Sequence, residues 1–151
     1  MPPNCRRQLA RLRGGAVAVE SAIVLSLWLL LVIASIELSL CALRYNLLAE
    51  ASRELSRQIM VHGSLSTDPW GPATLTVKAN SSSDLVAAVQ NRLPTMNTAD
   101  VDVEVEWLDG GNAPNDRVRI LIAYTHINHI PFAIINREMP LRAECIVRIL
   151  H

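Results

Sequence analysis

The stretch Ala16–Ile36, AVAVESAIVLSLWLLLVIASI, decides the fold. Its single ionisable side chain is Glu20, and residues 21–36 contain none. A helix that crosses the hydrocarbon core of a bilayer needs about 20 predominantly apolar residues. The sequence therefore predicts one membrane-spanning helix, which carries a carboxylate just inside its start.

The charges on either side of this stretch predict its orientation. Before the span, basic side chains occur without any acidic residue, and after it the two signs are mixed. Because basic residues are retained in the cytoplasm, we expect a cytoplasmic N-terminus, a single-pass anchor in the inner membrane and an extracytoplasmic C-terminal part. The basic residues of the leader are Arg6, Arg7, Arg11 and Arg13.

Two cleaved export signals are alternatives to a permanent span. A secretory signal has an apolar region of about 7–15 residues that ends at a small-x-small site, and this apolar run is longer. The segment Leu38–Cys41 resembles a lipoprotein signal, but the residue before the cysteine is Leu40, where a small residue is expected. Both alternatives are therefore weaker than the anchor.

The helix is predicted to continue beyond the membrane to His62. An apolar stripe at helical spacing, interrupted by one serine, follows the span and precedes Gly63, a plausible end. The sequence thus divides into a basic leader (1–15), a spanning and extended helix (16–62) and a small extracytoplasmic domain (63–151). The stripe consists of Tyr45, Leu48, Ser52, Leu55 and Ile59.

Three further segments in residues 63–151 have regular patterns. Residues 74–79 alternate as a short strand, and residues 140–150 supply a last strand. Between the first strand and Pro94, a small amphipathic helix follows three serines that offer N-caps. The apolar residues of this helix are Leu85, Val86, Val89 and Leu93.

The clearest strand signal is VDVEVEW (101–107), which is followed after a Gly-Gly loop by RVRILIAY (117–124). Both segments alternate apolar and polar residues, as strands with one buried face do. Pairing Glu106 with Arg117 places Val105 opposite Val118, so charge and apolar pattern agree on an antiparallel hairpin. The fold class is therefore α+β: a long N-terminal helix, a small helix and a three- to four-stranded antiparallel sheet.

Composition and motifs argue against several function classes. Aromatic residues are 4% of the chain, and no basic patch is interleaved with them, so single-stranded nucleic acid has no stacking platform. No phosphate-binding glycine loop, GxSxG or HExxH motif occurs, and we expect neither a cofactor nor enzymatic activity. Cys5, Cys41 and Cys145 are too few for a disulfide framework, and a Cys41–Cys145 bridge stays open.

Two patterns in the sequence could suggest a metal site, and neither is favoured. His126 and His129 lie in YTHINHIPF, which looks like the end of a strand and a turn, so both rings do not share one side. The acidic stripe Asp102, Glu104 and Glu106 would suit calcium, but it faces a basic partner strand and is more simply a solvated sheet face.

The order of residues around the span resembles the type IV prepilins, and more specifically the TadE-like proteins of tight-adherence pilus systems. The resemblance rests on RGGAVAVE (13–20), on the uninterrupted span that follows it, and on NLLAEASRELSR (46–57). One departure is Ser21, where such proteins commonly have an aromatic residue. Beyond residue 57 only the order of short strands and the last strand agree.

The resemblance implies that a prepilin peptidase cuts the leader after a glycine. Cleavage between Gly15 and Ala16 makes Glu20 the fifth residue of the mature chain, which selects this bond over the one after Gly14. The freed Ala16 ammonium would then be the counter-charge for Glu20 of a neighbouring subunit, since buried charges are tolerated only when matched.

By the same resemblance, the chain is a minor pilin-like structural protein whose partners are membrane lipid, the peptidase, other pilin or pseudopilin subunits and the Tad secretion machinery. An alternative is an unprocessed single-pass protein whose outer domain binds a partner. A small exported enzyme using His126 is a further alternative. The sequence does not decide between a place in the fibre and one at its base.

Overall fold

The computed structural model describes residues 3–128 and 138–150, without the side chains of residues 3–14 and of Ala88. Helix α1 runs over Pro3–Val61, so it ends one residue before the predicted boundary and also includes most of the leader. The described chain forms two compact units that meet between Ser39 and Leu40. The second unit therefore contains the last part of α1 together with all the other elements.

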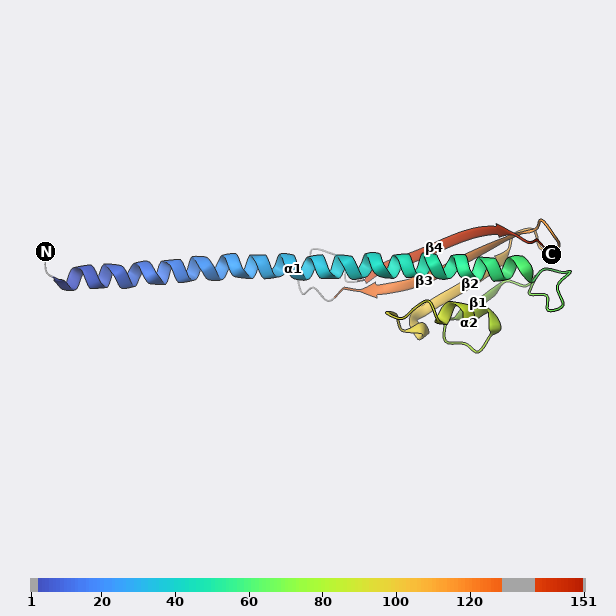
Figure 1. The fold of residues 1–151 in the computed structure, drawn as a ribbon, viewed down its shortest axis with the longest axis horizontal. Coiled ribbons are helices and arrows are strands. Elements are labelled where there is room, and N and C mark those ends of the chain that lie inside the picture. The colour runs from blue at the N-terminus through green and yellow to red at the C-terminus, as the bar shows by residue number, and fades with distance from the viewer. Residues whose placement is uncertain (1–2, 129–137, 151) are drawn as a thin grey trace. The chain divides into compact units, whose positions relative to one another are not determined.

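The second unit is built on one antiparallel sheet in the order β1-β2-β3-β4. Each strand is adjacent in the sheet to its neighbour in sequence, which is the simplest topology that short connections allow. Figure 1 shows the last part of α1 lying along this sheet. The predicted α+β class is confirmed with four strands: β1 (Leu75–Lys78), β2 (Val101–Trp107), β3 (Arg117–Ile127) and β4 (Glu138–Arg148).

Helix α2 (Asp84–Gln90) and a short 3-10 helix (Thr98–Asp100) lie in sequence between β1 and β2. The predicted helix was longer, because Leu93 was counted in it. Leu93 lies beyond Asn91, which caps the helix, yet its side chain is buried like that of Val89. The apolar pattern thus identified the buried residues correctly and overestimated the length of the helix.

Both helices pack on one face of the sheet. Alternate residues of β2 and β3 are buried, as a half-covered strand requires. On α1 the buried residues confirm the predicted stripe from Leu48 onward, whereas Tyr45 is half exposed. The core consists mainly of Leu48, Ala51, Leu55, Ile59, Val86, Val89, Val101, Val103, Val105, Val118, Ile120 and Ile122.

The predicted register of the β2–β3 hairpin is wrong by two residues. Glu106 lies opposite Arg119, and Val105 lies opposite Ile120. A shift of two leaves every side chain on its predicted face, because the side-chain period of a strand is two. The loop decides the register: Asp109 Oδ2 accepts from the backbone N–H of Arg117 at 2.8 Å, so Arg117 pairs with the loop and not with Glu106.

The segment between α1 and β1 makes a close contact with the sheet at Gly71. Gly71 has φ +93°, a conformation that favours glycine, and a Cβ placed on it would overlap the Trp107 ring. Trp70 stacks on His62 with ring centroids 4.0 Å apart. This segment is therefore held against both the end of α1 and the end of β2.

Candidate functional site: the apolar part of helix α1

The three residues predicted as processing and assembly sites all lie on α1. Gly15, Ala16 and Glu20 are exposed, and nothing lies within 4 Å of a Cβ built on Gly15. Ala16 and Glu20 are four positions apart, so they share one face of the helix about a turn from each other.

The helix that follows is long and apolar enough to cross a membrane. The candidate span is Gly15–Val61, its most apolar window has a mean hydropathy of 2.5, and none of that window is buried by the protein. A soluble core helix would hide such side chains, whereas Leu27 is 67% exposed. A single apolar N-terminal helix therefore supports anchoring in a membrane by one pass.

The four serines between Ala16 and Leu40 satisfy their own hydroxyl groups. Ser21 Oγ donates to the carbonyl of Val17 at 2.8 Å, one turn earlier in α1, and the other three bond to their own helix in the same way. This matters because hydrocarbon offers no partner to an unpaired polar group. The other serines are Ser26, Ser35 and Ser39, which donate to Ile23, Leu31 and Ser35.

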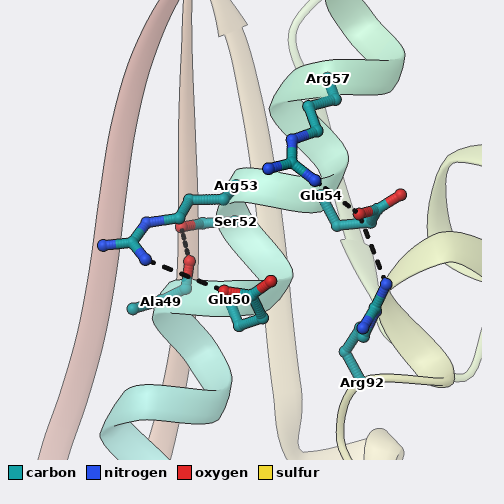
Figure 2. A network of polar contacts seen from close by, with 7 residues as sticks. All are labelled: Ala49, Glu50, Ser52, Arg53, Glu54, Arg57 and Arg92. Atoms are coloured by element: carbon teal, nitrogen blue, oxygen red, sulfur yellow. Dashed lines mark hydrogen bonds and ion pairs between the residues drawn. The ribbon is translucent and has the colours of Figure 1, made fainter.

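The polar side of α1 in the second unit carries a network of ion pairs (Figure 2). Glu50 pairs with Arg53 at 3.8 Å and Glu54 with Arg57 at 3.7 Å, both within the helix. Arg92, which follows α2, also reaches Glu54 at 3.5 Å. The Arg92 contact, which the sequence did not predict, joins the polar side of α1 to the segment after α2.

His126 lies near the end of β3, as the sequence predicted, and its side chain is buried. It is 2% exposed, and its Nδ1 accepts a hydrogen bond from Nη1 of Arg44. Because a guanidinium can only donate, this bond places the imidazole proton on Nε2. The Arg44 guanidinium also lies 5.6 Å from the centre of the Tyr124 ring. His129 lies outside the described residues.

Two carboxylates of the acidic stripe of β2, Asp102 and Glu106, are paired with basic side chains of the same sheet. Asp102 contacts Lys78 at 2.6 Å, and Glu106 contacts Arg119 at 3.3 Å. Arg119 also reaches Glu144 of β4 at 3.2 Å. Within residues 15–128 and 138–150, no group of three potential metal ligands comes together. The pairing supports the interpretation of a solvated sheet face.

A strong electrostatic shift lies in the β2–β3 loop. Hydrogen bonds from the Arg117 side chain and backbone lower the pKa of Asp109 from 3.8 to about 2. Its Oδ1 lies 2.7 Å from Nη2 of Arg117, and the same pairing raises the pKa of Arg117. The pair has a structural role in the hairpin and lies far along the chain from the predicted sites.

The thiols of Cys41 and Cys145 are both free and half-buried. The bridge that the sequence left open is therefore absent between these two residues. Cys5 belongs to the part of α1 whose side chains lie outside the description.

Comparison with known proteins gives a family match that lies within α1. Residues 15–57 match the model of the TadE family, described as TadE-like protein, whereas no curated protein and no solved structure matches the chain. The matched segment begins at Gly15, includes Glu20 and the apolar span, and ends within the polar network at Arg57. The match over residues 15–57 agrees with the TadE-like resemblance that the sequence predicted, and together with the apolar helix it fits a membrane protein associated with a Tad pilus.

Proposed function

We propose that this chain is a minor pilin-like structural subunit of a tight-adherence pilus system, matured by a prepilin peptidase that cuts between Gly15 and Ala16. The observation that carries the proposal is the extent of the family match, which starts at Gly15 and covers the exposed apolar helix. In this proposal the chain is a substrate of processing and has no catalytic role of its own.

The exposed scissile bond supports the peptidase step. A peptidase needs access to the backbone on both sides of the bond, and Gly15 and Ala16 are exposed. A helical backbone must open locally before cleavage, and a pair of glycines, Gly14 and Gly15, lowers the cost of that opening because glycine has poor helix propensity. The basic leader would keep the bond at the cytoplasmic face.

Exposure of the mature helix supports assembly through lateral helix contacts. Side chains that face lipid in a lone subunit can pack against the same helices of other subunits in a fibre. Apolar contacts of this kind have little directional preference, so they do not fix the axial position. A matched pair between the Ala16 ammonium and Glu20 of a neighbour would supply that register.

Processing is tested by the intact mass of the protein from its native host. The mature chain should lack residues 1–15, and Gly15→Leu should retain them. Gly14→Ala is the matched control, and it should still be cut after Gly15. A wild-type chain that keeps its leader would overturn the peptidase step and leave the unprocessed anchor with a partner-binding domain.

Register is tested separately with Glu20→Ala in a processed background. Membrane insertion should be retained, because the change makes the helix more apolar, and recovery of the subunit in assembled material should fall at least about tenfold if a buried pair is lost. Ser21→Ala is the control, since the Ser21 hydroxyl is satisfied inside its own helix. Normal assembly of the Glu20 variant would contradict the register role.

A further inference from the structure

The polar side of α1 in the second unit has an excess of positive charge (Figure 2). Glu54 Oε2 alone contacts two guanidiniums, Arg57 at 3.7 Å and Arg92 at 3.5 Å. The whole network has three guanidiniums for two carboxylates, which leaves one positive charge: Arg53, Arg57 and Arg92 for Glu50 and Glu54. The side chains of Arg53 and Arg57 are 69% and 74% exposed, so they are available to a partner.

Arg53 and Arg57 point away from the sheet. Arg57 follows the buried Leu48 by nine residues, which is about two and a half turns, so it lies on the opposite side of the helix. Arg53 lies one turn before Arg57 on that same side. We call this side, with Arg53 and Arg57, the outer side of α1.

The opposite face of the unit is the open face of the sheet, where the acidic stripe of β2 has an excess of negative charge. Arg119 is shared between Glu106 at 3.3 Å and Glu144 at 3.2 Å, so these three groups keep one negative charge. Glu104 is partly exposed and contacts no basic side chain among the described residues. The stripe is therefore complementary in charge to the outer side of α1.

Two hydrogen bonds fix how α1 lies along the sheet. Nη1 of Arg44 donates to His126 near the end of β3, and the Met60 carbonyl accepts from the backbone N–H of Leu150, which follows β4, at 3.0 Å. The last residues of β4 pair with the first residues of β3, so this stretch of α1 runs from the end of β3 towards its start. Because β2 is antiparallel to β3, α1 and β2 run in the same direction.

Arg53 and Glu104 lie at about the same level on opposite faces of the unit. Arg53 is near the middle of the stretch between the two hydrogen bonds, and Glu104 lies opposite Leu121, near the middle of β3. The next charges follow at similar distances. Arg57 comes four residues later, about 6 Å along the helix, and Glu106 comes two residues later, about 6.6 Å along the strand.

We propose that the outer side of α1 in one copy docks on the acidic stripe of a second copy, through the pairs Arg53–Glu104 and Arg57–Glu106. Copies inserted in one membrane by the same anchor share one orientation to it, so the two sets of charges run in the same order. The contact joins two different faces, so it is heterologous and can repeat from copy to copy. Each exposed pair is weak, but confinement in the membrane raises the effective concentration of the copies.

This inference rests on the proposed assembly of subunits side by side, but it needs neither cleavage of the leader nor the Glu20 pair. The test uses the full chain with its three cysteines replaced by serine. One version carries Asn46→Cys, two turns before Arg53 on α1, and a version with a larger tag carries Thr125→Cys on the open face; both positions are exposed. Both versions are reconstituted together in phosphatidylcholine vesicles and treated with a short bifunctional thiol reagent.

We expect cross-links between positions 46 and 125, and charge reversal tests their cause. Arg53→Glu in the Asn46→Cys version should lower the cross-linked yield about fivefold, because an attraction becomes a repulsion. Glu104→Arg in the Thr125→Cys version should do the same, and the two changes together should restore the yield. Asp84→Arg is the matched control, since this exposed carboxylate lies on α2 and not on the open face.

Equal yields in all four combinations of charge would overturn the inference, because cross-linking would then report random collision. Predominant cross-links within one version would also overturn it, because the contact would then join identical faces. An absence of cross-links in vesicles of this chain alone would overturn it as well. Restored yield in the double combination shows that each variant is folded. A chain that keeps its leader in the processing assay would refute the peptidase step and leave this contact standing.

Discussion

Two parts of helix α1 show how one element can serve two environments. In residues 16–36 the apolar side chains are exposed except for Val32 and Ala34, which are partly buried, and in residues 48–59 they are buried on one stripe against the sheet. The first part is apolar on every face, whereas the second has ion pairs opposite its stripe. Continuous apolarity therefore indicates lipid or helix partners, and a one-sided stripe indicates packing within the subunit.

The largest effect that would test this contrast is expected from Leu55→Ala. Leu55 is fully buried, so its truncation should lower the free energy of unfolding of the domain by about 2–5 kcal/mol. Leu27→Ala on the exposed part is the matched control and should leave domain unfolding unchanged. Both are measured by thermal unfolding in detergent. Similar losses at the two positions would contradict the division of α1 into two parts.

A smaller effect is expected where the segment after α1 meets the sheet. Gly71→Ala should cost about 1–3 kcal/mol, because the new methyl group meets the Trp107 ring and the backbone has φ +93°. Gly110→Ala is the control: Gly110 has φ +72° with nothing within 4 Å, so only the backbone cost of roughly 1 kcal/mol applies. Equal costs would show that the Trp107 contact is not restrictive. Denaturant unfolding monitored by tryptophan fluorescence measures both.

The polar side of α1 should contribute less. Arg92→Ala removes the contact with Glu54. Because Arg92 is about half exposed and Glu54 is partly exposed, we expect a loss of about 0–1 kcal/mol that shrinks with added salt. A double-mutant cycle with Glu54→Gln isolates the pair from the Arg57 contact. A coupling that persists undiminished at high salt would show that the network is more structural than its exposure suggests.

The smallest effect concerns pH. The pKa of Asp109 is lowered to about 2 from 3.8, so its pairing with Arg117 stabilises the fold fully above the higher value and is lost as pH falls towards the lower one. Asp109→Asn should therefore be less stable than the wild type at neutral pH, with the difference disappearing towards pH 2. Thermal unfolding of both proteins across this range measures it. A constant difference at all pH values would contradict this role for Asp109.

The spacing of apolar residues in the sequence predicted those features of the fold that repeat along the chain. It identified the span, the stripe from Leu48 to Ile59 and the inward faces of β2 and β3, because burial imposes a period on each element. It could not fix the hairpin register, since a shift of two residues preserves the faces. Asp109 determines that register, because its carboxylate accepts hydrogen bonds from the backbone N–H and the side chain of Arg117.

Contacts between distant segments had no sequence signal. The Arg44–His126 bond joins residues separated by 82 positions, and only the tertiary fold brings them together. Similarly, the Arg92–Glu54 contact depends on where the chain emerges from α2. The proposed processing and assembly residues could be named from the sequence alone, because they are defined by their order along one helix and not by any tertiary contact.

The inward hydrogen bonds of the four serines between Ala16 and Leu40 have a consequence for how a lone subunit behaves. Ser21, Ser26 and Ser35 lie between Glu20 and Glu37, and their hydroxyls are satisfied within the helix. This stretch therefore presents no polar side to lipid, and the bilayer does not favour one rotation of it about its own axis. The rotation of this stretch about its own axis would be set by the carboxylates at its two ends and by contacts with neighbouring subunits. In the proposed assembly, an incoming subunit would thus meet a span that the bilayer does not hold in one orientation, and the charged ends of the two spans would set how they face each other.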